Sequence, residues 1–130
     1  MSDKQYAITL DKERCIVRLI VHGEIAKDVG ERIITQARTT AAENQYNILC
    51  DVRQARVKAS FADWFYLPRK LAVFQKTRAV KTAILITSGQ QEEEYKFFET
   101  VTHNLGIGHK IFLQEDDALD WLKEVMVEKG

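Results

Sequence analysis

The chain has 130 residues, 45% of them apolar and 29% charged, which predicts one globular domain. It has a single proline and no tract rich in glycine and serine, which excludes a linker, and no apolar run reaches the ~18 residues of a membrane span. The N-terminal segment lacks the basic, apolar and small-residue pattern of a secretion signal, so we expect a cytoplasmic protein.

The net charge of zero conceals an uneven distribution. Residues 52–82 carry eight lysines and arginines and one acid, whereas residues 91–130 carry ten acids and four bases. These regions could steer an anionic partner or face each other between subunits, or they could be two solvated faces that differ. The acidic end and the neutral total argue against a nucleic-acid partner.

The first part of the chain predicts a hairpin followed by a helix. Apolar runs over about 5–10 and 14–22, separated by a polar turn, indicate two antiparallel strands. Asp28-Val-Gly-Glu31 has the form of a capping box, and the helical spacing after it extends to about Glu43.

Two further strands and a helix are expected next. Residues 46–52 (YNILCDV) and 81–87 (KTAILIT) are apolar enough for buried strands, and residues 61–76 form a helix between them. Pro68 could kink this helix or begin a second segment.

The last third predicts two helices around a strand. Ser88-Gly-Gln-Gln91 forms another capping box, and the helix after it should stop at Gly106. A strand over 109–114 follows. The final helix begins with acids 115–117, and its apolar face consists of Ala118, Leu119, Leu122, Val125 and Met126.

The resulting order, ββαβαβαβα, predicts an α/β fold with a mixed five-stranded sheet and four helices. Together with NILCDVR in the middle strand, HNLGIGHKIF at a turn from helix to strand and DDALDWL near the end, it resembles the SpoIIAA-like fold of the STAS group of anti-sigma-factor antagonists. The resemblance covers nearly the whole chain and is closest to the branch of uncharacterised bacterial SpoIIAA-like proteins. It implies a single regulatory domain that acts through protein contacts.

The resemblance also draws attention to Ser60. In the antagonists, Asp-Ser-Ser-Gly stands at the start of a helix some eight residues after the middle strand, and phosphorylation of one serine breaks the partner complex. Here the same place reads Ala59-Ser60-Phe61-Ala62, so one of four positions survives. Ser60 is a candidate switch serine, but we expect it to cap the helix together with Asp63.

The helix over 61–76 carries more apolar surface than one sheet contact requires. Three interpretations stay open: deep burial, a subunit interface, or a surface for lipid or another apolar ligand at an anionic membrane. The candidate residues for such a surface are Trp64, Phe65, Tyr66, Leu67, Arg69, Lys70 and Val73.

The sequence contains no catalytic motif such as a nucleophile elbow, a Walker loop or a dinucleotide fingerprint, so we expect no enzyme and no cofactor. Asp51, at the end of a strand, is the best isolated acid, although it could simply pair with Arg53. The histidines and cysteines lack metal-ligand spacing, and we expect Cys15 and Cys50 to be buried free thiols.

The sequence therefore predicts a non-enzymatic protein-interaction module that forms a homodimer through the 61–76 helix and binds an unknown protein partner. The alternative is a small domain that binds an apolar ligand, lipid or membrane surface through residues 61–78.

Overall fold

The computed structural model describes residues 5–72 and 80–124, except the side chains of residues 61 and 70–72. Strands and helices follow one another as β1 (Tyr6–Asp11), β2 (Ile16–Ala26), α1 (Lys27–Asn44), β3 (Asn47–Lys58), α2 (Phe61–Ala72), β4 (Thr82–Leu85), α3 (Glu92–Asn104), β5 (His109–Phe112) and α4 (Glu115–Lys123). This order is the one predicted. The end of the predicted 61–76 helix, including Val73, and the apolar positions Val125 and Met126 lie outside the described residues.

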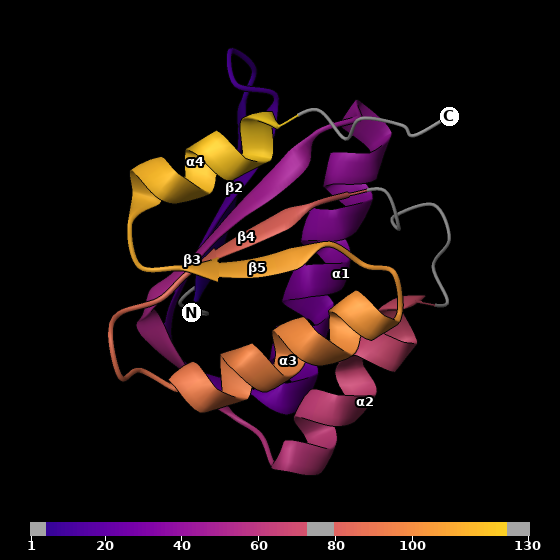
Figure 1. Cartoon of the computed structure of the whole chain (residues 1–130), viewed down its shortest axis with the longest axis vertical. Helices are drawn as coiled ribbons and strands as arrows, with labels where there is room; N and C mark the ends of the chain where they lie inside the picture. Colours follow the sequence, from indigo (N-terminus) through magenta and orange to yellow (C-terminus); the bar gives the residue numbers. More distant parts are fainter. Residues whose placement is uncertain (1–4, 73–79, 125–130) are drawn as a thin grey trace.

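The five strands form one sheet in the order β1-β2-β3-β4-β5, with β1 antiparallel and the other neighbours parallel. Each parallel connection therefore moves one strand in the same direction, and right-handed crossovers then place α1, α2 and α3 on the same face. The last helix, α4, covers the opposite face. Figure 1 shows α4 above the sheet and α2 and α3 below it.

The alternation of side chains along the strands creates two apolar cores. In β3, Ile48, Cys50 and Val52 belong to the larger core under α1, α2 and α3. Leu49 points the other way and joins the smaller core under α4. Among the described residues, the buried members of that smaller core are Ile16, Leu49, Ala83, Leu85, Ala118 and Leu122.

Strand β3 continues to Lys58, so the prediction that it ends at residue 52 was wrong. After a register shift near Ile20, the end of β2 pairs with the polar half of β3. On the other edge, the Gln91 side chain accepts from the Val57 N–H (2.9 Å) and donates to the Val57 carbonyl (2.8 Å). Glutamine side chains thus take the place of a neighbouring strand, which allows a polar segment to remain extended.

Two predicted capping boxes are absent from the structure. Helix α1 starts directly after Ala26, which still pairs with Lys58, so Asp28 falls inside the first turn rather than at the cap. Helix α3 begins after Gln91, which has a left-handed backbone (φ 47°) and makes no side-chain cap. The Gln91 side chain is instead engaged by β3. The predicted stop of α3 is confirmed, since Gly106 adopts φ 76° just after the helix.

The two cysteines differ in their surroundings. Both are free, and Cys50 is buried as predicted. The prediction that Cys15 is buried was wrong, because it is exposed in the turn between β1 and β2 with φ 55°. The Cys15 side chain therefore does not belong to a buried strand, which is where the sequence pattern placed it.

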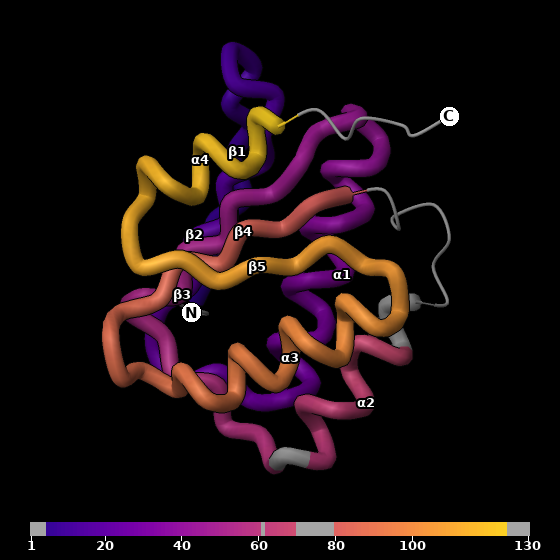
Figure 2. The backbone as a smooth tube through the Cα atoms, viewed as in Figure 1, coloured from indigo at the N-terminus to yellow at the C-terminus, as the bar shows by residue number. Residues whose placement is uncertain are grey.

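Helix α2 packs mainly against α3 and touches α1 only lightly. Figure 2 shows α2 and α3 side by side, although β4 separates them in the sequence. Pro68 is buried inside α2, so no second helical segment begins there. Because α2 packs on α3 rather than on the strands, it covers part of the sheet but leaves a space between itself and the strands.

Candidate functional site: a cavity under helix α2

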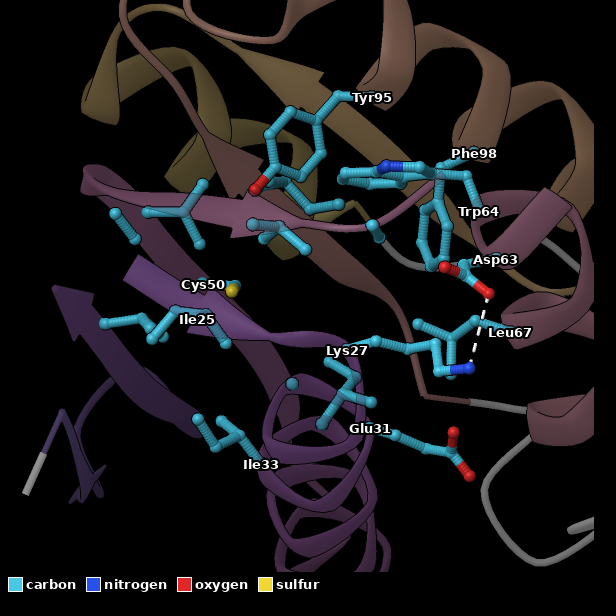
Figure 3. Close-up of a pocket in the computed structure, with 18 of the residues that line it drawn as sticks. Ile25, Lys27, Glu31, Ile33, Cys50, Asp63, Trp64, Leu67, Tyr95 and Phe98 are labelled. Carbon is cyan, nitrogen blue, oxygen red and sulfur yellow. Dashed lines mark ion pairs between the residues drawn. The ribbon is translucent and has the colours of Figure 1, made fainter. Parts of the chain in front are cut away.

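A cavity of about 280 Å³ lies between the sheet and the three helices on its larger face (Figure 3). For comparison, an apolar cavity of ~150 Å³ in another protein holds benzene. The lining is mostly apolar and comes from four strands and three helices. Its main residues are Leu19, Val21, Cys50, Val52 and Ile84 of β2, β3 and β4, Ile33 and Ile34 of α1, Trp64 and Leu67 of α2, Tyr95 and Phe98 of α3, and His109 of β5. This space has the size and character of a site for a small organic molecule.

Aromatic rings form the wall that α2 and α3 share. The Trp64 ring lies edge-on to Tyr95, with the centroids 4.9 Å apart, and to Phe98 at 6.0 Å. Phe98 in turn lies edge-on to His109 at 4.9 Å. These are favourable aromatic geometries. Trp64 is only 5% exposed, so deep burial accounts for this residue of the predicted surface.

Three of these wall residues contain buried polar atoms without a partner. Trp64 Nε1, the Tyr95 hydroxyl and both ring nitrogens of His109 make no hydrogen bond to any part of the chain that the structure describes. Figure 3 shows the Tyr95 hydroxyl directed into the cavity. A buried polar atom without a partner costs about 1–3 kcal/mol, and native proteins contain few of them. A polar group in the cavity would reduce this cost.

The titratable groups of the inner wall are all uncharged at neutral pH. Burial, together with the Arg38 charge, lowers the pKa of His109 to about 3. Burial and the charge of Asp51 raise the pKa of Cys50 to about 12. Burial also raises the pKa of the Tyr95 hydroxyl well above its usual value. The interior therefore presents polar atoms but no charge.

Charged residues line the outer end of the cavity. Lys27 Nζ lies 3.4 Å from Asp63 Oδ1, which joins the start of α1 to the first turn of α2 (Figure 3). Glu31 and Tyr66 also contribute to the lining here, and Tyr66 is 57% exposed. The cavity thus passes from a charged rim to a neutral, apolar interior.

Ser60 caps α2, as the sequence predicted. Its hydroxyl accepts a hydrogen bond from the Asp63 N–H (3.2 Å), and the Asp63 carboxylate accepts one from the Ser60 N–H (3.0 Å). This reciprocal pair is a capping box. The bond from the Ser60 N–H and the Lys27 charge lower the pKa of Asp63. A role of Ser60 as a phosphorylation switch stays a prediction.

Asp51 lies on the opposite face of the sheet from the cavity and pairs with Arg53. The Arg53 guanidinium donates to the two carboxylate oxygens at 2.9 and 2.7 Å, and the Arg53 N–H adds a third bond at 3.1 Å. These bonds lower the pKa of Asp51. The structure therefore supports the simpler interpretation of Asp51, an ion pair with Arg53, and places this pair within β3 rather than at the end of the strand.

The surface predicted on the 61–76 helix divides into two sides. Trp64 and Leu67 face the cavity. Phe65 is half-buried against Phe97 with the Arg69 guanidinium 4.4 Å from its ring centroid. Tyr66 and Arg69 are exposed, and the Lys70 side chain and Val73 lie outside the described residues.

Sequence reasoning missed the part of the site that comes from other elements. Tyr95 and Phe98 lie three residues apart on α3, a spacing that indicates a shared helix face. No sequence pattern around His109 or Cys50 indicated that these residues line the same cavity. These residues meet Trp64 only because the sheet and the crossovers bring α2, α3 and β5 together.

No protein-family model matches the chain, and a search of curated proteins gave no match. In three dimensions the chain is similar to the crystal structure of an uncharacterised protein of the DUF3478 family, with a SpoIIAA-like fold, from Shewanella loihica PV-4. The match covers 94% of this chain and 98% of that chain, with a TM-score of 0.61 and 20% sequence identity. This protein has a SpoIIAA-like fold. At that identity the similarity establishes the fold alone.

Two kinds of feature are absent from the described ranges 5–72 and 80–124. These ranges contain no group of three or more histidine, cysteine, aspartate or glutamate side chains placed to hold a metal ion. Likewise, none of their helices combines the length and apolar composition needed to cross a bilayer.

Proposed function

We propose that the protein is a non-enzymatic binding domain whose cavity holds a small, mainly apolar molecule. The observation that carries this proposal is the cavity of about 280 Å³, whose apolar walls contain buried polar atoms without partners in the described chain. The sequence suggested an apolar ligand as the alternative function, on the outer surface of the 61–78 segment. The proposal moves the ligand to the inner side of α2.

The protonation states of the inner wall support binding rather than catalysis. A general acid or base works best with a pKa near the operating pH. The pKa of His109, about 3, and that of Cys50, about 12, both lie far from neutrality because the groups are buried. Neither ring nitrogen of His109 has a hydrogen-bonded partner in the described chain, whereas an activated base is oriented by such a partner.

The proposal is tested by filling the cavity. Ala55 lies in the lining and is 4% exposed, so Ala55→Leu places three more carbon atoms in the space. Ala62→Leu makes the same change on the exposed side of α2 and serves as the control. The probe is naphthalene, and its affinity is measured by NMR or calorimetry. We expect it to bind the wild type and the Ala62→Leu variant equally and to bind the Ala55→Leu variant at least tenfold more weakly. Equal binding by all three proteins would overturn the proposal.

A second candidate function concerns the outer side of α2. Tyr66 is 57% exposed, and the neighbouring Phe65 is held between Phe97 and the Arg69 guanidinium. Tyrosine and arginine are enriched at the centres of protein interfaces. We infer that this face contacts a second copy of the chain, which gives the homodimer expected from the sequence, or another protein partner.

The cytoplasm is the compartment that we propose for this activity. The chain has two cysteines, and both are free thiols, including the exposed Cys15. Free exposed thiols persist in reducing compartments. Oxidation of Cys15 in cell extracts can be followed by thiol labelling, and full labelling without prior reduction is expected.

A further inference from the structure

We propose that the cavity selects an uncharged ligand that carries a hydroxyl or carbonyl group on an apolar body, and that Trp64, Tyr95 and His109 bind this group. This inference rests on the proposed function and specifies the chemical class of the ligand. It comes from the three residues whose polar atoms lack partners in the described chain. Their rings form one continuous wall with Phe98, which lies between Trp64 and His109.

The hydrogen-bonding capacity of the wall defines the polar group. The indole of Trp64 can only donate, the Tyr95 hydroxyl can donate and accept, and a neutral imidazole has one donor and one acceptor nitrogen. The wall thus offers three donors and two acceptors. A ligand oxygen that accepts is therefore the best complement, and a hydroxyl can also donate in return. A pure hydrocarbon would leave every one of these atoms unpaired.

The charge of the wall excludes an ionised ligand group at this end. His109, Cys50 and Tyr95 are neutral at pH 7, for the reasons given above. The buried Arg38, whose charge acts on His109, is not part of the lining, and its guanidinium donates to the Thr82 hydroxyl at 3.4 Å. A carboxylate or ammonium would enter the wall without a partner of opposite charge, and burying an unpaired charge is far more costly than burying a hydroxyl.

The rim supports the same class of ligand. Its lysine is already paired, since Lys27 lies 3.4 Å from Asp63. Among the lining residues that the structure describes, Lys27 is the only lysine or arginine. The described part of the rim therefore offers an anion no unpaired cation. An uncharged molecule passes it without losing an ionic hydration shell.

Three matched probes test this selectivity: naphthalene, 2-naphthol and 2-naphthoate. They share one bicyclic body and differ only in the polar group. Because a net hydrogen bond contributes a few-fold to about tenfold in affinity, we expect 2-naphthol to bind roughly 3- to 10-fold more tightly than naphthalene. We expect 2-naphthoate at pH 7 to bind at least tenfold more weakly than 2-naphthol.

NMR and one conservative variant locate the polar group. The indole N–H signal of Trp64, identified with a Trp121→Phe variant, should move downfield with 2-naphthol and not with naphthalene. Tyr95→Phe removes only the hydroxyl and should remove most of the preference for 2-naphthol while leaving naphthalene affinity within about twofold. Tyr46→Phe makes the same change outside the cavity lining and is the control.

The outcomes separate the two proposals. Equal binding of naphthalene and 2-naphthol, or tightest binding of 2-naphthoate, overturns the inference about the polar group and leaves the cavity as an apolar binding site. Failure of all three probes to bind overturns the proposed function as well. A hydroxyl preference that persists unchanged in Tyr95→Phe, with no shift of the Trp64 signal, also contradicts the inference.

Discussion

The two faces of the sheet are built from the same strands but are packed differently. Under α4, buried apolar side chains pack together, and the polar groups of Lys81 and Asn47 beside them are paired. Lys81 Nζ donates to the Trp121 carbonyl at 2.7 Å and lies 4.3 Å from the Trp121 ring centroid. Asn47 Oδ1 accepts from the Lys81 N–H at 2.9 Å. This face is a closed structural core.

The face under α1, α2 and α3 is larger and incompletely filled. It holds the cavity, and its buried Trp64, Tyr95 and His109 contain polar atoms without partners in the described chain. A core selected only for stability would replace such residues by apolar ones of similar size. Under the proposed function this difference between the faces follows from binding, because a bound ligand would supply partners for these polar atoms.

The sharpest comparison is between adjacent residues of β4 that point to opposite faces. Leu85 is fully buried under α4, whereas Ile84 lines the cavity. Leu85→Ala should lower the free energy of unfolding by about 3–5 kcal/mol and Ile84→Ala by about 2–3 kcal/mol, because a side chain beside empty space has fewer contacts to lose. Urea denaturation of the ligand-free protein measures both. Equal costs would mean that the cavity is closed or filled in solution.

Acid should weaken the cavity face through His109. Its pKa is about 3 in the folded protein and about 6.5 in an unfolded chain, so below pH 6.5 the unfolded state binds a proton that the folded state does not. The free energy of unfolding should therefore fall on acidification by up to about 1.4 kcal/mol per pH unit, or about 2 kcal/mol at pH 5.

Two variants separate this contribution from the titration of other groups. His109→Phe should remove most of the loss between pH 6.5 and 5, whereas His103→Gln, at an exposed position, should leave it unchanged. Chemical denaturation at each pH gives the result. The same pH dependence in wild type and His109→Phe would show that His109 is not held neutral.

Loss of the N-cap of α2 should lower the stability of the helix that covers the cavity. Ser60→Ala should cost about 1 kcal/mol, the usual effect of losing a helix N-cap. Ser60→Asp should preserve the melting temperature, since aspartate also caps well. If Ser60→Asp abolished a partner complex without changing stability, Ser60 would be a switch in addition to a cap.

The outer side of α2 should affect assembly but hardly affect stability. Tyr66→Glu at this exposed position should change the unfolding free energy by less than about 0.5 kcal/mol. Light scattering at tens of micromolar should show a dimer mass for the wild type and a monomer mass for the variant. A monomer mass for both proteins would refute the homodimer.

Local patterns explain which predictions were confirmed. The alternation of apolar strands and amphipathic helices predicted the order of elements and the mixed sheet, because both periods can be read along the chain. The Ser60–Asp63 box was also correct, since both partners lie within one turn. The stop at Gly106 depends only on its own backbone freedom.

Contacts between distant segments decided the rest. The capping boxes predicted at Asp28 and Ser88 do not form, because Ala26 stays paired with β3 and the Gln91 side chain makes its hydrogen bonds to β3. The extension of β3 to Lys58 has the same cause. The cavity is the strongest case, because its wall joins Trp64 with residues from α3 and β5. The elements and their order can thus be read from the sequence. That α2 rests on α3 and leaves a space between itself and the sheet follows only from the tertiary structure, since packing between helices far apart in the chain has no local period.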